Sequence, residues 1–289
     1  MKKRVLVTGA TGFVGRGIAE HFARDWQVSG AGRKAEGFPV GFYHAVDLVQ
    51  GPDAARLLLE EIRPDAVIHC AGMKDVRWCE ANPAAAEKIN GTATQWVAEA
   101  AAVTGAKFVY LSTDLVFPCD RGGYREADDP DPKLVYGKTK LSGEKFALAS
   151  SETAAICRTS GVFGKNSPVL GWLEKELRSG KGVDAFADVI NTPTYLPDLG
   201  RMIERILTKN LFGIFHLCGS EAVSRLEWFK AFAAANDFDI SQIRSSLAGG
   251  RFEELLLSPD SSLVGEATYA AIGLRPRVLS EAFAEMKGA

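Results

Sequence analysis

Tyr136 and Lys140 are the pair of residues in this 289-residue chain whose types and spacing most clearly predict chemistry. They lie four positions apart at the start of an expected helix, so their side chains share one helical face. A tyrosine with the ordinary pKa of about 10 exchanges its proton poorly at neutral pH. A lysine ammonium one turn away favours the phenolate and should lower that pKa, so that Tyr136 can protonate a carbonyl oxygen or accept an alcohol proton. The alternative is an exposed helix with an incidental tyrosine and lysine.

A hydroxyl group for the same site comes from the end of an expected strand, Lys107 to Asp114. Ligands in open parallel sheets bind at the carboxyl ends of the strands. We therefore expect Thr113 to orient the carbonyl that Tyr136 protonates, and Lys140 to hold the nicotinamide ribose. The long connection from Pro118 to Pro132, which is rich in proline, aspartate and glycine, is expected to cover the site.

Three glycines near the amino end predict a dinucleotide site. An apolar run rich in β-branched residues ends at Gly9, and a helical pattern begins near Phe13. Gly9 permits a tight turn, Gly12 lets the backbone approach a pyrophosphate, and Gly15 lets the helix lie close to the strand. The free amides at the helix start then face the anion. The spacing Gly-x-x-Gly-x-x-Gly differs from Gly-x-Gly-x-x-Gly and indicates another subtype of this loop; an ordinary strand-to-helix turn is the alternative.

The end of the second expected strand, Trp26 to Arg33, indicates the type of dinucleotide. An acidic residue there would bind the free ribose hydroxyls of NAD, whereas a basic residue favours the extra phosphate of NADP. Arg33 and Lys34 stand at this point without a competing acid, so we expect NADP(H), with NAD(H) as the alternative. The predicted cofactor contacts are Gly9, Thr11, Gly12, Phe13, Val14, Arg33, Lys34, Asp47, Leu48, Cys70, Ala71, Gly72, Asn90, Tyr136 and Lys140.

Two of these residues have a second interpretation. Asp47 lies in the expected third strand, Phe42 to Leu48, where its carboxylate can reach the adenine amino group or cap the next helix, Asp53 to Ile62. Asn90 lies in a long expected helix, Pro83 to Val103, either at the bottom of the site or simply on a helix face.

The order of elements predicts an α/β fold of the Rossmann type, with a doubly wound parallel sheet. Strands and helices alternate up to Gly164, and the strand Pro64 to Gly72 is continuously apolar, as central parallel strands are. Beyond Gly164 the alternation weakens. We expect residues 1–164, with 190–220 returning to them, to form the dinucleotide-binding domain, and residues 165–189 and 221–289 to form a small substrate-binding lobe.

Composition argues against several classes of partner. The formal net charge is -2 and no basic block is present, so neither nucleic acid nor an anionic membrane is expected. No apolar stretch is long enough to cross a bilayer, and a cytoplasmic location is expected. The five cysteines are far apart without a Cys-x-x-Cys pair, so they indicate reduced thiols and neither a metal site nor a disulfide framework. His69 and His216 fall in expected strands, which favours buried structural imidazoles.

The motifs together resemble the extended short-chain dehydrogenase/reductases, and within them the TDP-4-dehydrorhamnose reductase family, which includes the regulatory subunit of methionine adenosyltransferase. The resemblance covers nearly the whole chain. It implies reduction of a 4-keto nucleotide sugar by NADPH or NADH, with Thr113, Tyr136 and Lys140 as the catalytic set, Asp114 beside them, and a possible homodimer. It rests on Thr8 to Gly15, Cys79 to Pro83 with Asn90, Leu111 to Phe117, Tyr136 to Lys140, Arg158 to Ser160, Pro193 to Tyr195, and Asp198-Leu199.

The chain departs from this family's pattern at three places that concern the substrate. Val76 to Glu80 stands where the family has Val-Asp-x-x-Glu, and Gly161 replaces a tryptophan that would form an aromatic wall for a sugar. The segment Ser258 to Leu263 lacks the arginine that would clamp a phosphate. Two alternatives to the reductase therefore stay open: a sugar-nucleotide epimerase or dehydratase, and a catalytically silent NADP-binding regulatory subunit.

Overall fold

A parallel sheet of seven strands forms the centre of the computed structural model, which describes residues 2–35 and 38–288. The strand order is β3-β2-β1-β4-β5-β6-β9, so the order reverses between β1 and β4. Such a reversal leaves a crevice at the carboxyl ends of the strands. The Rossmann-type prediction is confirmed. The strands are β1 (Arg4–Thr8), β2 (Gln27–Gly32), β3 (Phe42–Ala45), β4 (Ala66–His69), β5 (Lys107–Thr113), β6 (Ala154–Thr159) and β9 (Gly213–His216).

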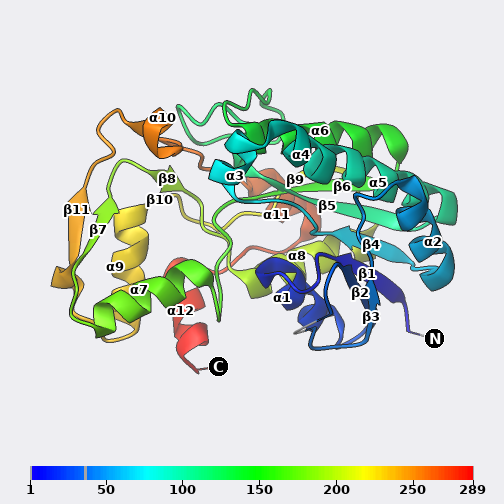
Figure 1. Ribbon diagram of the computed structural model, residues 1–289. Coiled ribbons are helices and arrows are strands. Elements are labelled where there is room, and N and C mark those ends of the chain that lie inside the picture. The colour runs from blue at the N-terminus through cyan, green and yellow to red at the C-terminus, as the bar shows by residue number, and fades with distance from the viewer. Residues whose placement is uncertain (1, 36–37, 289) are drawn as a thin grey trace.

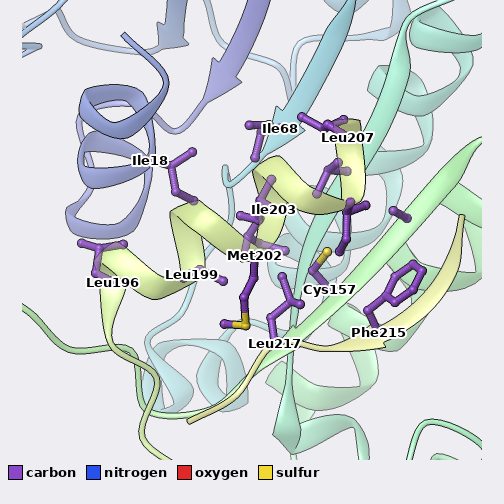
Figure 2. Packing of buried hydrophobic residues seen from close by; sticks show 14 of the residues in the cluster. Ile18, Ile68, Cys157, Leu196, Leu199, Met202, Ile203, Leu207, Phe215 and Leu217 are labelled. Carbon is purple, nitrogen blue, oxygen red and sulfur yellow. The ribbon is translucent and has the colours of Figure 1, made fainter. Parts of the chain in front are cut away.

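Helices cover both faces of the sheet because successive strand residues point to opposite faces. Val5 and Val7 belong to the apolar cluster under α1 (Phe13–Phe22) and α8 (Leu196–Lys209). Leu6 belongs to the cluster under α2 (Pro52–Ile62), α5 (Ala93–Thr104) and α6 (Val135–Ser150). Figure 1 shows these two layers of helices on either side of the strands. In Figure 2, Leu199, Met202 and Ile203 point from α8 toward the sheet.

The long helix expected from Pro83 to Val103 contains an interruption. It consists of α4 (Pro83–Glu87), a π-helical turn from Lys88 to Thr92, and α5, and the short helix α3 (Val76–Ala81) precedes it. A π turn holds one residue more than an α turn and is frequent at functional sites. Asn90 lies inside this turn.

A smaller part of the molecule lies beside the carboxyl edge of the sheet, at the left of Figure 1. It contains two small sheets that the sequence pattern did not predict: β7 (Val183–Phe186) with β11 (Ile243–Ser246), and β8 (Ile190–Asn191) with β10 (Val223–Ser224). Its helices are α7 (Pro168–Arg178), α9 (Arg225–Ala235), α10 (Phe252–Leu255) and α12 (Leu279–Gly288). Its core is a separate cluster that includes Phe163, Leu173, Trp228, Phe232 and Phe283.

The helix α11 (Glu266–Ile272) packs with the sheet and not with this smaller part. Leu263, Tyr269 and Ile272 belong to the cluster of α1 and α8. We propose that the chain forms the two predicted domains, except that the stretch from Leu263 to Ile272 belongs to the dinucleotide-binding domain. Among the described residues, no helix is long and apolar enough to cross a membrane.

Candidate active site

The glycine turn has the geometry that its sequence predicts. Gly9 adopts φ +64° and donates its amide to the Ala31 carbonyl at 2.8 Å. A Cβ on Gly15 would lie 2.3 Å from the Gly9 carbonyl oxygen, so only glycine lets α1 approach the turn this closely. Within the described chain no side chain caps α1, and no acid stands in its first turn. An uncapped helix start beside a glycine turn fits a pyrophosphate.

The end of β4 lies next to this turn. A Cβ on Gly9 would lie 2.8 Å from the Cα of Ala71, and the Ala71 amide donates to the Thr8 hydroxyl at 3.2 Å. The His69 ring lies between the hydroxyls of Thr8 at 2.8 Å and Thr94 at 3.2 Å. Burial lowers the pKa of His69 to about 3, so the imidazole is neutral and structural. The prediction of a satisfied buried histidine is confirmed here.

His216 differs from His69 in one respect. Its Nδ1 lies 3.1 Å from the Val264 carbonyl oxygen, whereas its buried Nε2 has no hydrogen-bond partner among the described residues. Burial lowers the pKa of His216 to about 4. This imidazole is therefore neutral and buried, and only one of its two ring nitrogens has a hydrogen-bond partner among the described residues.

The predicted adenosine contacts lie at the ends of β2 and β3. Arg33 and Lys34 follow β2, are exposed, and form no ion pair within residues 2–35 and 38–288. Asp47 follows β3 and accepts a hydrogen bond from the Val49 amide at 3.3 Å. The helix α2 begins at Pro52 after Gly51, so the alternative that Asp47 caps this helix is wrong.

The remaining cofactor candidates gather at the same edge of the sheet, because the carboxyl ends of parallel strands meet there. Thr11 and Gly12 belong to the turn, Phe13 and Val14 open α1, Leu48 follows β3, and Cys70, Ala71 and Gly72 follow β4.

Asn90 uses its amide within the protein. Its Nδ2 donates to the Met73 carbonyl at 3.0 Å and to the Thr139 hydroxyl at 3.0 Å, and its Oδ1 accepts from the Met73 amide at 2.7 Å. Both of its amide protons are therefore occupied. The side chain is buried and joins the loop after β4 to α6, so its interpretation as a residue on an ordinary helix face is wrong.

Lys140 lies on α6 as predicted, but its ammonium does not lie against the Tyr136 phenol. The Nζ atom donates to the Leu111 carbonyl at 2.5 Å and lies 3.9 Å from the centre of the Tyr110 ring. Burial lowers the pKa of Lys140 to about 7.

The pKa of Tyr136 depends on burial and on two other neighbours, Asp114 and Thr113. Burial, and next the charge of Asp114, raise its pKa well above the ordinary value, and a hydrogen bond with the Thr113 side chain opposes them. The expectation that Lys140 lowers this pKa is therefore wrong here, because the ammonium is directed to the carbonyl of Leu111.

Asp114 accepts hydrogen bonds from three hydroxyl groups, one on the preceding residue and two on residues far away in the sequence. Thr113 donates to Oδ1 at 2.8 Å, while Ser160 and Ser261 donate to Oδ2 at 2.6 Å and 2.7 Å. Burial raises the pKa of the Asp114 carboxyl, and these hydrogen bonds act against that rise. Sequence reasoning missed both serines as site residues, although Ser160 lies in a segment that carries the family pattern and Ser261 lies in one that departs from it.

The local structure explains why a glycine stands at position 161, where the family pattern has a tryptophan. Gly161 adopts φ +47°, and a Cβ there would lie 2.8 Å from the Asn191 side-chain nitrogen. A larger residue at this place would require Asn191 to move. Among the described residues, no group of three or more histidine, cysteine, aspartate or glutamate side chains could hold a metal ion.

Comparisons with known proteins agree with this geometry. The family described as RmlD substrate binding domain matches residues 2–287. The chain is 32% identical over 254 residues to methionine adenosyltransferase 2 subunit beta of Bos taurus, covering 84% of this chain and 75% of that one. It is 29% identical over 282 residues to a dTDP-4-dehydrorhamnose reductase of Mycobacterium tuberculosis, covering 95% and 88%. The crystal structure of dTDP-4-dehydrorhamnose reductase from Bacillus anthracis in complex with NADP matches with a TM-score of 0.87 at 26% identity, covering 99% of each chain.

Proposed function

Because this chain belongs to the RmlD substrate binding domain family of extended short-chain dehydrogenase/reductases, we propose that it reduces a keto group of a nucleotide sugar, with Tyr136 as the acid. It is an NAD(P)-dependent oxidoreductase of the dTDP-4-dehydrorhamnose reductase type, and its cofactor is NADP(H), with NAD(H) as the alternative. The observation that carries the proposal is the contact of Thr113 with both Asp114 and Tyr136 at the sheet edge that also holds the uncapped start of α1.

The residues at this edge fit the cofactor. The free amides at the start of α1 would bind the pyrophosphate, Arg33 and Lys34 the extra phosphate, and Lys140 the nicotinamide ribose. When bound, the reduced nicotinamide supplies the hydride for the carbonyl carbon.

Tyr136 would donate the proton that the carbonyl oxygen needs. Its raised pKa keeps the phenol protonated at neutral pH, as an acid in the reductive direction must be. Asp114 is held by hydroxyls on both carboxylate oxygens, so it fixes the Thr113 side chain against which Tyr136 lies.

A 4-keto-6-deoxy nucleotide sugar is the substrate class that we propose. The names of the reductases from Mycobacterium tuberculosis and Bacillus anthracis support it. The segment Ser258 to Leu263 supplies no arginine for a diphosphate, so any cation for that group must come from another part of the chain.

Loss of reduced-nicotinamide absorbance with a panel of such sugars tests the assignment. We expect Tyr136→Phe to lower kcat by about 10²- to 10⁴-fold, the usual contribution of a general acid, while the Kd for NADPH is unchanged. Tyr195→Phe is the matched control, since Tyr195 is buried and its hydroxyl donates to Glu285 Oε1 at 3.4 Å. Retained turnover in Tyr136→Phe would refute the role of the phenol.

A regulatory subunit is the second candidate, because the chain shares 32% identity with a subunit of methionine adenosyltransferase. This candidate predicts tight NADPH binding, no turnover, and co-elution with the other subunit of such an enzyme. A homodimer and a cytoplasmic location are also proposals, which light scattering and cell fractionation would test.

A further inference from the structure

A buried ion pair lies beside the proposed catalytic residues. Arg158 of β6 and Glu144 of α6 are each 2% exposed and meet through two hydrogen bonds: Nε to Oε1 at 3.0 Å and Nη2 to Oε2 at 2.8 Å. The guanidinium lies 4.8 Å from the centre of the Phe117 ring, and its buried Nη1 has no hydrogen-bond partner in the described part of the chain. Glu144 is therefore the main compensation for the Arg158 charge.

The pair joins one helix to two neighbouring strands. Ser112 and Arg158 are register partners across β5 and β6, and the Ser112 hydroxyl donates to Glu144 Oε1 at 2.5 Å. The carboxylate thus holds both strands one residue before Thr113 and Thr159, where the strands end.

Glu144 is also the last of three α6 side chains, spaced four residues apart, that contact β5. Tyr136, Lys140 and Glu144 recur every four residues, so they lie along one face of the helix. Tyr136 contacts the Thr113 side chain, Lys140 donates to the Leu111 carbonyl at 2.5 Å, and Glu144 binds Ser112. A shift of α6 along the strand would break all three contacts together.

A charged pair is an expensive way to fill a buried site, since apolar residues of similar volume are often as stable. The negative charge of Glu144 also affects the protonation of Lys140. Among the groups that face Lys140, the Glu144 carboxylate favours the ammonium and burial opposes it, while the Cys70 thiol is neutral near pH 7 because burial raises its pKa to about 12. The other neighbours are the neutral His69 of β4 and the Tyr110 ring of β5.

We propose that Glu144 and Arg158 are positioning residues, which fix α6 against β5 and place a compensating carboxylate one turn from Lys140. The proposal rests on the proposed function of Lys140 and Tyr136. The Glu144 side chain is only 2% exposed and is bound to Ser112 and Arg158, so its effect on a ligand would pass through Lys140 and Tyr136.

The test compares variants by the pH dependence of NADPH binding, which needs no sugar substrate. Protonated Lys140 should favour binding, so the wild-type affinity should fall as the pH rises through about 7, and Lys140→Met should lack this step. Glu144→Gln with Arg158→Met removes both charges and leaves neither uncompensated. We expect its step to move down by about one pH unit, and its kcat to fall about tenfold to a hundredfold.

Asp198→Asn is the matched control for lost stability. Asp198 is fully buried and is bound by Arg277 through both carboxylate oxygens, away from α6. This variant should lower Tm and leave the pH step in place.

A folded double variant with the wild-type pH step and kcat would overturn the proposal. If the double variant fails to fold, Ser112→Ala decides, because it removes one contact and keeps both charges. We then expect an unchanged pH step with kcat lowered about tenfold; an unchanged kcat would overturn the positioning role. If the wild type turns over no sugar, the reductase assignment fails, while the pH step in NADPH binding still tests the charge of Glu144.

Discussion

Asp114 shows how much of this site depends on single hydroxyl groups. Its carboxylate is buried and accepts hydrogen bonds from Thr113, Ser160 and Ser261, so hydroxyl groups satisfy the charged form. The charge of Asp114 in turn helps to raise the pKa of Tyr136. The Asp114 charge therefore favours the protonated phenol, the form that can donate a proton, while making it a weaker acid than a free tyrosine.

The basic residues after β2 carry a prediction at the same scale. We expect Arg33→Ser to weaken NADPH binding by about tenfold to a hundredfold and to leave NADH binding unchanged, because a charge-assisted hydrogen bond is worth about 1.5–3 kcal/mol. Isothermal titration with both cofactors measures this difference. Arg24→Ser, another exposed arginine at the far end of α1, is the control. Equal losses for NADPH and NADH would contradict a phosphate contact.

At the scale of elements, α1 and the glycine turn form one rigid unit. We expect Gly15→Ala to destabilise the protein by about 1–3 kcal/mol, because the added Cβ would lie 2.3 Å from the Gly9 carbonyl oxygen. NADPH affinity should fall with it, since the turn must shift.

Gly171→Ala is the matched control for this substitution. Gly171 lies inside α7, and nothing surrounds the position of its Cβ within 4 Å. Alanine there should stabilise by about 0.5–1 kcal/mol through helix propensity. Thermal unfolding of both variants checks the pair of predictions, and a Gly15→Ala variant as stable as the wild type would contradict the close approach of α1.

The elements that the sequence predicted are those with a strong local signal. The strands of the central sheet are short apolar runs, and Gly9 and Gly15 mark the turn, so the Rossmann arrangement followed from the pattern. The strand Ile243–Ser246 carries one apolar residue in four, and β8 and β10 have two residues each, so no periodicity could reveal them.

The site was predictable only where its residues lie near one another in the sequence or on adjacent strand ends. Thr113, Tyr136 and Lys140 were predicted in this way, and the structure brings the Thr113 and Tyr136 side chains into contact. Ser261 lies 147 positions from Asp114, and only folding brings them together. The direction of the Lys140 ammonium was missed for a related reason, because its acceptor is a backbone carbonyl, which sequence spacing does not reveal.

At the scale of the whole molecule, one segment joins the two parts at the active site. Asp260 donates its amide to the Cys119 carbonyl at 3.0 Å, and Ser261 donates its amide to the Ile190 carbonyl at 3.0 Å. The Ser261 hydroxyl meanwhile binds Asp114. The smaller part of the molecule is therefore attached directly to the Asp114 carboxylate, at the carboxyl edge of the sheet where the uncapped start of α1 also lies.

The central claim is that this assembled site transfers hydride to a sugar carbonyl while Tyr136 supplies the proton. The most direct measurement uses NADPH that carries deuterium at the transferred position, with mass spectrometry of the nucleotide sugar after incubation with a 4-keto-6-deoxy substrate. We expect one deuterium per product molecule with the wild type, and labelled product formed about 10²- to 10⁴-fold more slowly with Tyr136→Phe. Tight binding of the labelled cofactor by the wild type, with no deuterium in any sugar of the panel, would contradict the reductase and favour the regulatory subunit.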